Sequence, residues 1–381
     1  MRVTHVINVA EIPGRPLFSG SEQHVFVLMA EQQSRGLQVE FAPQVFRDGP
    51  NLQKKFSELQ AAGITVAPTL VNGPYHWQTN LRLLPRLLPF FRTRRQRLIH
   101  THLDGVDYAA RFAAGLAGCR RVISTVHNNE PHYARRRERL QLQFLDRWNA
   151  RYIAISECVH RYLVDRLGLP PKKIVTIYYG LPAPAAILTR TEARRRLGLD
   201  PDDPRFTVGF IGRFEPQKDP HSLLRAAAEI PELQLVMVGA GSLAVDLLRD
   251  AQRLPDGQVH FIPYRPDAAD LIPAFDLLCL PSRWEGFGLV LLEAMVRNVP
   301  IAGSTAGAIP EILDHGRCGL LFDPSQPSAL TTCLRYAMAQ RQELSLLAQR
   351  AAAWAESRFT TAAMVEQTLT VYREVSGKQK S

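Results

Sequence analysis

PSRWEGFGLVLLEAM, residues 281–295, carries the chain from the end of an apolar strand into an amphipathic helix. Its two glutamates, Glu285 and Glu293, have seven residues between them, which places one before the helix and the other inside it. Gly286 and Gly288 let a ligand approach the backbone, and the free N–H groups of a helix start attract phosphate. A carboxylate inside the helix can accept hydrogen bonds from a ribose diol. A capping glutamate followed by a surface glutamate would give the same spacing, but the flanking residues favour a ligand site.

A second loop, GRFEPQKD at residues 212–219, follows the strand expected at residues 207–211. It carries two cations five positions apart, Arg213 and Lys218. A guanidinium offers a two-pronged fork for phosphate oxygens, whereas an ammonium group is a compact charge. Held together, they could stabilise a diphosphate as it departs with its negative charge. The alternative is a pair of solvated loop cations.

Three glycine-bearing turns adjoin strands or helices: Ser19-Gly20-Ser21-Glu22, Gly239-Ala240-Gly241-Ser242 and Ala306-Gly307-Ala308-Ile309-Pro310-Glu311. Each could hold backbone N–H groups against an anion or a sugar. The second turn lacks the third glycine of a dinucleotide fingerprint, which argues against a nicotinamide cofactor.

Histidines and acids at other strand ends are weaker candidates. His127 follows the strand expected at residues 122–126, at the edge where doubly wound sheets bind ligands. It could hydrogen-bond a sugar hydroxyl or have a structural role. His100 and His102 could indicate a metal, but no third or fourth ligand lies at a suitable spacing. The Asp200-Pro201-Asp202 segment lies in a turn-rich linker, where we expect it to be solvated. We therefore predict no metal site.

Short β-branched runs alternate with amphipathic stretches along the whole chain. This alternation predicts an α/β fold with parallel sheets covered on both faces. We expect two doubly wound, Rossmann-like domains facing each other across a cleft, residues 1–182 and 183–361, with a hinge near Pro182 and Pro184. The last helix, about 362–381, is expected to pack back on the first domain. The predicted strands span residues 3–9, 39–43, 64–67, 98–101, 122–126, 152–155, 174–178, 207–211, 235–238, 259–262, 277–280, 299–302 and 319–322.

The positive charge lies in the N-terminal half. The net charge is +10, yet residues 1–190 hold 26 Lys and Arg against 13 Asp and Glu, and residues 191–381 hold 20 against 23. Such asymmetry suits an anionic partner: a membrane surface, a phosphorylated substrate or nucleic acid. The segment LRLLPRLLPFFRTRRQR, residues 81–97, could lie on an anionic membrane or cover a sheet. Pro85 and Pro89 are expected to interrupt a long helix there.

Composition excludes several classes of protein. With 46% hydrophobic and 22% charged residues, the chain can form packed cores and is not disordered. No apolar run approaches the ~18 residues of a membrane span, and no secretory signal is visible. Five cysteines without CxxC spacing are typical of reduced thiols in a cytoplasmic protein. Nucleic acid is disfavoured as a partner because no recognition helix, zinc or stacking signature accompanies the charge.

Together these segments resemble glycosyltransferase family 4, the retaining nucleotide-sugar transferases of the GT-B fold. GRFEPQKD looks like the family's phosphate motif, VGAGS like its glycine turn and PSRWEGFGLVLLEAM like its E-x7-E block. SGSEQHV, TVHNN and AISECVHRYLVDRLGLPPKKIVTIYYG look like its first loop, histidine and pre-hinge segments. Three positions depart from the family pattern: Ser19 stands where paired glycines are usual, Tyr179 where asparagine is common, and Asn298 where glycine usually precedes x-Pro.

The resemblance implies a role for each candidate residue. Arg213 and Lys218 would hold the donor diphosphate, Glu293 the ribose and Glu285 the hydroxyls of the donor sugar. His127 would face that sugar. The residues that would complete the donor site are Gly20, Gly241, Phe287, Gly288 and Leu289, with Tyr264 and Arg265 near the nucleobase.

The resemblance also implies hexose transfer with retention, without a metal ion or other cofactor. No second carboxylate suggests itself as a nucleophile, so we expect front-face transfer in which the departing phosphate helps to deprotonate the acceptor. Glu285 as a covalent nucleophile is the alternative. A UDP-sugar is the favoured donor and GDP-mannose the next. The basic N-terminal half favours an anionic, lipid-linked glycan acceptor at the inner membrane face, in cell-envelope polysaccharide or lipopolysaccharide synthesis.

Two other interpretations stay open. One is a GT-B enzyme that acts on a small soluble acceptor, such as a phosphorylase, an epimerase or a small-molecule glycosyltransferase. The other is a basic membrane-surface or nucleic-acid-binding protein without catalysis, against which the paired motifs argue.

Overall fold

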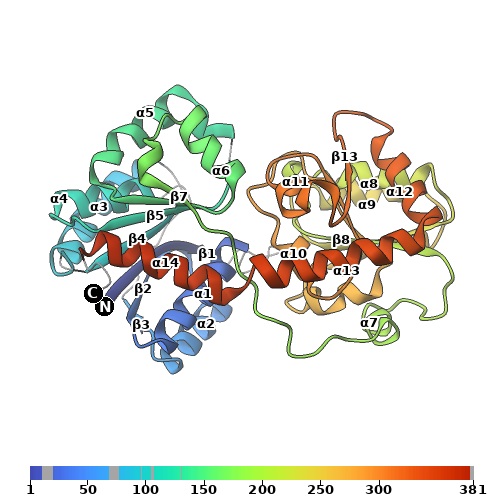
Figure 1. Cartoon of the computed structure of the whole chain (residues 1–381), viewed down its shortest axis with the longest axis horizontal. Helices are drawn as coiled ribbons and strands as arrows, with labels where there is room; N and C mark the ends of the chain where they lie inside the picture. Colours follow the sequence, from blue (N-terminus) through green and yellow to red (C-terminus); the bar gives the residue numbers. More distant parts are fainter. Residues whose placement is uncertain (11–19, 68–76, 96, 104–106, 130, 378–381) are drawn as a thin grey trace. The chain divides into compact units, whose positions relative to one another are not determined.

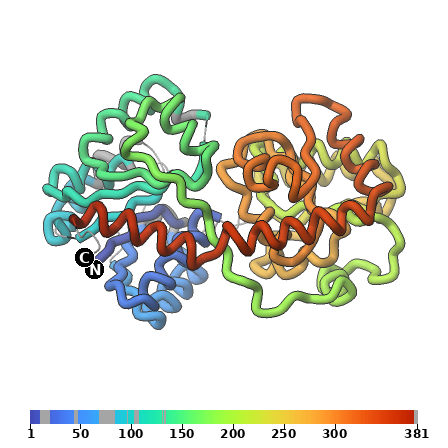
Figure 2. Tube along the Cα trace, in the orientation of Figure 1, coloured from blue at the N-terminus to red at the C-terminus, as the bar shows by residue number. Residues whose placement is uncertain are grey.

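The computed structural model describes residues 1–377 except 11–19, 68–76, 96, 104–106 and 130. The described residues form two compact units (Figure 1). Unit 1 holds the residues up to Gly180 and those from Thr361 onward, and unit 2 holds Leu181–Thr360. The boundaries expected from the sequence were residues 182 and 362. Because the chain leaves unit 1 and returns to it, the first strand and the last helix belong to the same unit (Figure 2).

Unit 1 is built on a parallel sheet with the strand order β3-β2-β1-β4-β5-β6-β7. The strands are β1 (Arg2–Ala10), β2 (Gln38–Arg47), β3 (Thr65–Val66), β4 (Leu98–Leu103), β5 (Val122–Val126), β6 (Arg151–Ala154) and β7 (Ile174–Thr176). The helices are α1 (Gly20–Ser34), α2 (Pro50–Ala61), α3 (Trp77–Arg92), α4 (Asp107–Leu116), α5 (Arg136–Leu145), α6 (Glu157–Arg161) and α14 (Thr361–Val375), with short turns η1 (Pro131–Ala134), η2 (Asp146–Trp148), η3 (Tyr162–Arg166) and η4 (Pro171–Lys173).

Alternation along β1 divides the core of unit 1 between the two faces of the sheet. Val3 and Ile7 pack into one apolar cluster with α1, α2 and α14, whereas Val6 packs into a second cluster with α3 and α4. Successive side chains of a strand point to opposite faces, so His5 lies on the face covered by α1 and α14. That face carries the polar residues described below.

Unit 2 repeats the same plan with the strand order β10-β9-β8-β11-β12-β13, all parallel. The strands are β8 (Phe206–Ile211), β9 (Leu233–Gly239), β10 (Val259–Pro263), β11 (Leu277–Leu280), β12 (Ile301–Ser304) and β13 (Leu320–Phe322). The helices are α7 (Arg190–Arg196), α8 (Pro220–Ala228), α9 (Ala244–Ala251), α10 (Leu289–Met295), α11 (Ile309–Ile312), α12 (Ala329–Ala339) and α13 (Arg341–Arg358), with turns η5 (Pro216–Lys218), η6 (Ala268–Ala274) and η7 (Asp314–Gly316).

These two sheets confirm the predicted α/β class, and each predicted strand overlaps an observed one. Each strand order reverses direction once, between β1 and β4 in unit 1 and between β8 and β11 in unit 2. In open α/β sheets, ligands bind beyond the carboxyl ends of the strands at this reversal. The loops that follow β8 and β11 are the two motifs that the sequence singled out.

The helix α3 corrects one expectation. Pro85 and Pro89 both lie inside this 16-residue helix and do not end it. Its Leu87 and Phe91 are fully buried against the sheet, so the segment covers the sheet of unit 1. Arg94 and Arg97 form ion pairs with Glu40 at 2.7 and 2.8 Å and lower the pKa of that carboxyl. Among the described helices, none has the length and apolar character needed to cross a membrane.

Candidate functional site

Gln217 joins the two motif loops of unit 2. Arg213, in the loop after β8, donates from Nη2 to Gln217 Oε1 at 2.9 Å. Gln217 Nε2 in turn donates to the carbonyl of Trp284 at 3.1 Å, and its own carbonyl accepts from the backbone N–H of Arg283 at 2.8 Å. The loops after β8 and β11 are thus held together at the reversal of the sheet. Gln217 lies within the motif at residues 212–219, but the sequence alone predicted no role for it.

Lys218 and Glu285 form a largely buried ion pair across the same two loops. Lys218 Nζ donates to the Glu285 carboxylate, whose side chain is about one-tenth exposed. Ser282 Oγ donates to the same carboxylate at 3.2 Å. The structure therefore brings together Arg213, Lys218 and Glu285, as expected, but it already pairs the Lys218 charge. Arg213, by contrast, is exposed to solvent.

The turn at residues 306–311 packs against the backbone of Glu285. The Ala308 N–H donates to the Glu285 carbonyl at 2.9 Å. Gly307 has φ 61°, and a Cβ there would overlap the backbone of Glu285. The sequence suggested that this turn cradles a ligand. The structure gives its glycine another use, which is the close approach of two loops.

Glu293 lies on α10, which begins at Leu289 directly after Gly288 (φ 88°). Burial raises the pKa of the Glu293 carboxyl; Arg297 lowers it and Asp270 raises it further. The Arg297 guanidinium donates to Asp270 at 2.7 Å and to the Glu293 carbonyl oxygen at 3.1 Å. Among the described residues, none donates a hydrogen bond to the Glu293 carboxylate. A partly buried carboxylate with open acceptor positions suits a ligand that brings its own hydroxyl donors.

The remaining candidates of unit 2 make contacts within the protein. A Cβ on Gly241 would overlap the backbone of Phe214, so this glycine lets the turn after β9 pack on the loop after β8. Phe287 is buried and meets Phe359 edge to face, at 5.8 Å between ring centroids. Arg265 forms a two-pronged ion pair with Asp267 at 2.6 and 2.8 Å. The neighbouring Tyr264 is partly buried, which raises its pKa.

In unit 1, His127 lies just beyond β5 and is held at both ring nitrogens. Its Nδ1 accepts from or donates to the Tyr179 hydroxyl, and its Nε2 lies 3.1 Å from His102 Nδ1. Burial lowers the pKa of His127 to about 3, so the ring is neutral. Tyr179 also packs on His24, with ring centroids 4.1 Å apart. Gly20 begins α1, and Ser19 lies outside the described residues.

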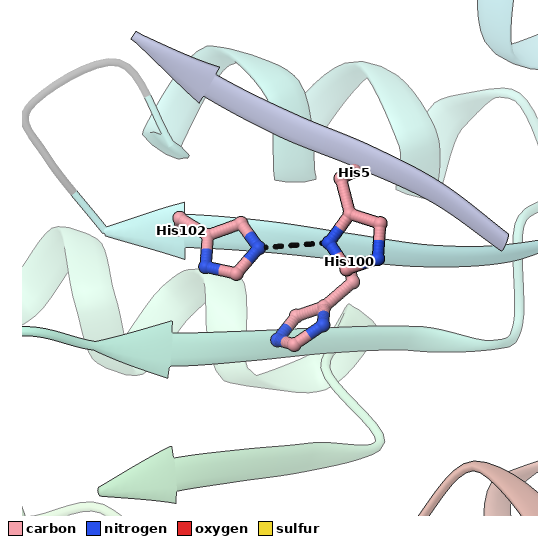
Figure 3. A group of neighbouring side chains, drawn as sticks. All are labelled: His5, His100 and His102. Atoms are coloured by element: carbon pink, nitrogen blue, oxygen red, sulfur yellow. Dashed lines mark hydrogen bonds between the residues drawn. The ribbon is translucent and has the colours of Figure 1, made fainter. Parts of the chain in front are cut away.

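His5 lies beside His100 and His102 and is a third neighbour that spacing along the sequence did not reveal. Its ring lies beside theirs in Figure 3, and ring nitrogens of the three histidines fall within 4.8 Å of one another. The β1–β4 register pairs His5 with His100. The signal was present in the strand order, since the first and fourth strands are neighbours in sheets of this type. Asp200 and Asp202 are exposed, as expected.

Two family models match the chain in succession. The model described as Glycosyltransferase Family 4 matches residues 18–183, and the one described as Glycosyl transferases group 1 matches residues 189–354. The chain belongs to the family 4 type of glycosyltransferase.

Curated relatives of this family 4 chain include two D-inositol 3-phosphate glycosyltransferases. The protein from Rhodococcus jostii is 34% identical over 215 residues, which are 51% of this chain and 46% of that protein. The protein from Thermobispora bispora is 31% identical over 246 residues, which are 59% of this chain and 56% of that protein. The chain therefore spans about half the length of the curated relatives it matches.

Solved structures share the fold over nearly the whole length of the family 4 chain. HepE from Anabaena, in complex with UDP, gives a TM-score of 0.81 at 22% identity and covers 98% of this chain and 100% of its own. WaaG, a glycosyltransferase involved in lipopolysaccharide biosynthesis, gives 0.73 at 16% identity with 98% and 100% coverage. The expected GT-B fold is thereby confirmed.

Proposed function

We propose that the protein is a retaining glycosyltransferase that moves a hexose from a nucleoside-diphosphate sugar to a hydroxyl of an anionic acceptor. One observation carries this proposal. At the reversal of the unit 2 sheet, an exposed Arg213, a Lys218–Glu285 ion pair and the open carboxylate of Glu293 lie on loops and a helix next to one another. A diphosphate, a sugar and a ribose need these three kinds of group.

Each group has a distinct task in this proposal. Arg213 and Lys218 bind the diphosphate, and the Glu293 carboxylate accepts hydrogen bonds from the ribose diol. Glu285 accepts from a hydroxyl of the donor sugar with the lone pairs that Lys218 and Ser282 leave open. The backbone of Phe287, Gly288 and Leu289 completes the cradle. In unit 1, Gly20 would bind a phosphate and His127 a sugar hydroxyl.

Transfer proceeds on one face of the sugar. The bond from the anomeric carbon to the diphosphate oxygen breaks, and the bond to the acceptor oxygen forms on the same face. The acceptor proton passes to the departing phosphate oxygen, while Arg213 stabilises the negative charge that grows there. Support for this route over a covalent intermediate comes from Glu285, whose carboxylate is engaged by Lys218 and Ser282. No step requires a metal ion.

UDP is the favoured nucleoside diphosphate of the donor. HepE, which has the same fold, was solved with UDP and with UDP-glucose. GDP-mannose is the next candidate, and the residues that would decide between them follow β10, at Tyr264 and Arg265. Of the three GT-B alternatives, a phosphorylase and an epimerase form other products, whereas a small-molecule glycosyltransferase differs in its acceptor.

The acceptor is proposed to be a lipid-linked glycan at an anionic membrane surface. Support comes from α5 and its flanks, where Leu140 and Phe144 are 52% and 46% exposed. Exposed arginines lie on the same helix and its flanks, namely Arg135, Arg136, Arg137, Arg139 and Arg147. Exposed apolar side chains on a helix rich in arginine suit the headgroup region of an anionic bilayer. The helix α3 no longer supports this contact, because it covers the sheet.

A small phosphorylated acceptor is the second candidate. The curated relatives are named as D-inositol 3-phosphate glycosyltransferases, so their printed acceptor is small and anionic. The basic N-terminal half suits such an acceptor as well as it suits a membrane.

One assay with three incubations separates the two acceptors. Purified protein is incubated with UDP-hexose, and release of UDP is followed with inositol phosphate, with lipid-linked glycan in vesicles, or with no acceptor. The proposal expects release only when an acceptor is present, and retention of the anomeric configuration in the product. Release without any acceptor contradicts transfer. The double variant Leu140→Ser/Phe144→Ser should lose vesicle binding but keep transfer to a soluble acceptor, with Leu248→Ser, an exposed residue of α9, as the control.

A further inference from the structure

We propose that the side-chain amide of Gln32 fixes the tautomer of His127 through a chain of buried histidines, so that Gln32 and Tyr179 are positioning residues for the sugar-facing histidine. This inference rests on the proposed function for the role of His127, and its test separates the two.

The upper arm of the chain runs from α1 across the sheet of unit 1 to His127. Gln32 Oε1 lies 2.8 Å from His5 Nε2, and His5 Nδ1 lies 3.0 Å from His102 Nε2, the contact drawn in Figure 3. His102 Nδ1 lies 3.1 Å from His127 Nε2, and Tyr179 meets His127 Nδ1. Gln32, His5 and His102 are at most 2% exposed.

The lower arm begins at the amide nitrogen of Gln32, whereas the upper arm begins at its amide oxygen. Gln32 Nε2 donates to the Tyr372 hydroxyl of α14 at 3.1 Å. Tyr372 lies 2.6 Å from His100 Nδ1, and His100 Nε2 lies 2.7 Å from Thr125 Oγ1. Every ring nitrogen of His5, His100, His102 and His127 thus has a protein partner. A metal ion at His5, His100 and His102 would have to break these bonds, so we read the cluster as a hydrogen-bond chain.

Gln32 alone sets the direction in which protons are donated along these hydrogen bonds. A neutral imidazole, a tyrosine and a threonine can each either donate or accept, whereas an amide oxygen only accepts and an amide nitrogen only donates. In the amide orientation that the structure gives Gln32, Oε1 faces His5, so His5 donates from Nε2 and accepts at Nδ1. His102 must then donate from Nε2, and His127 must do the same. His127 therefore carries its proton on Nε2, and its Nδ1 accepts from Tyr179.

Burial keeps the four histidines neutral, and only a neutral ring can donate at one nitrogen and accept at the other. The pKa of His5 falls to about 4 and that of His127 to about 3, both through burial. Burial also holds the pKa values of His100 and His102 well below the usual range, and the neighbouring histidines lower them further. None of the four rings is protonated near pH 7.

The consequence for the sugar is specific. His127 Nε2–H is committed to His102, so a ligand can reach only Nδ1 without breaking the chain. At that nitrogen the ring accepts a hydrogen bond, so the sugar must present a hydroxyl donor that replaces or shares the Tyr179 hydroxyl. Tyr179 stands where the family commonly has asparagine, so this chain holds its histidine with a phenol.

The tautomer can be read directly. In protein labelled with ¹⁵N-histidine, long-range proton–nitrogen correlations at pH 7 report which ring nitrogen carries hydrogen, and the His127 signals are assigned from their loss in His127→Asn. We expect hydrogen on Nε2. Hydrogen on Nδ1, or a protonated ring, overturns the proposal. This readout needs no activity, so it stands or fails independently of the transferase assignment.

Two variants test the direction. Gln32→Met removes both fixed polar groups, whereas Thr125→Val breaks only the far end of the lower arm. Gln32→Met should give His127 a mixture of tautomers and lower kcat about tenfold, the effect of losing one buried hydrogen bond, with the Kd for UDP unchanged. Thr125→Val should leave the His127 tautomer and kcat as in the parent. Equal losses of kcat in the two variants, or an unchanged tautomer in Gln32→Met, contradict the proposal. UDP binding without any transfer, together with hydrogen on Nε2, would contradict the proposed function alone.

Discussion

At Arg213 the positive charge of the candidate donor site is open to solvent, whereas Glu285 already neutralises the charge of Lys218. The two cations are therefore unequal. In the proposed function, Arg213 would stabilise the charge that develops on a departing diphosphate, whereas Lys218 would also hold the carboxylate that binds the sugar. This difference makes Arg213 the residue whose loss should be felt most in the chemical step.

Arg213→Ala should lower kcat by about 10²–10³, because an aligned donor to a developing oxyanion is lost. The Kd for UDP should change much less. Steady-state release of UDP measures the first and calorimetry the second. Arg249→Ala, an exposed arginine of α9, is the control. An Arg213→Ala enzyme that turns over like the parent would remove the leaving-group role.

Glu293→Ala should raise the Kd for UDP about ten- to a hundredfold, because hydrogen bonds to a charged group are worth about 1.5–3 kcal/mol. Without nucleotide, its Tm should be equal to or above that of the parent, since burial of the carboxylate is unfavourable, as its raised pKa shows. The exposed Glu229 gives the control variant Glu229→Ala. Unchanged affinity for UDP would refute the ribose contact.

The buried histidines predict acid sensitivity. Their folded-state pKa values lie below the unfolded value of about 6.5, so the unfolded chain binds more protons as pH falls below that value, and stability is lost toward pH 4. His5 and His127 should each lower the free energy of unfolding by about 2 kcal/mol between pH 7 and pH 5. Hydrogen exchange at the two pH values measures this loss unit by unit. Equal protection of the strands of unit 1 at both values would contradict it.

At the scale of elements, three loops of unit 2 act together. The loop after β8 is joined to the loop after β11 by Gln217, and the turn after β12 supports the backbone of Glu285. Gly241 and Gly307 allow close packing between loops, which is one reason for glycine in these motifs.

Gly307→Ala should destabilise unit 2 and displace Glu285, because the new Cβ would overlap its backbone and φ is positive. Gly257→Ala separates the two causes, since Gly257 also has positive φ (71°) but open space around it. We expect the free energy of unfolding to fall by about 1–2 kcal/mol in Gly257→Ala, and by about 1–3 kcal/mol more in Gly307→Ala. Chemical denaturation measures the loss of stability, and UDP titration measures the displacement of Glu285. Equal losses would show that the loop contact is unimportant.

The elements also show what local sequence can and cannot predict. The strands were predictable because apolar runs between helical patterns need only neighbouring residues to be recognised. His5 was not, because it lies about a hundred positions from His100 and meets it only through the β1–β4 pairing. Pro85 and Pro89 are exposed in α3, whereas Leu87 and Phe91 anchor the helix to the sheet, so the burial of its apolar side outweighs the two missing backbone hydrogen bonds. Gln217 and Gln32 act through contacts that no motif spells out.

For the whole molecule, each unit has its own sheet reversal, and the candidate residues gather beyond them. Unit 2 holds the groups proposed for the donor, and unit 1 holds the histidine chain and the basic surface of α5. In the proposed function, Arg213 and Lys218 would supply the charge that a metal would otherwise bring to the diphosphate, so we expect the donor to bind in the presence of a chelator.

The most direct measurement is a thermal-shift screen of the purified protein with UDP, GDP, ADP, CMP and NAD in excess EDTA. A ligand at 100 times its Kd adds about 2.7 kcal/mol, which moves a melting point by several degrees. We predict a shift with one nucleoside diphosphate, UDP first, and a much smaller shift in Glu293→Ala. A shift with NAD alone, or none with any of the five, would contradict a metal-independent nucleotide-sugar site.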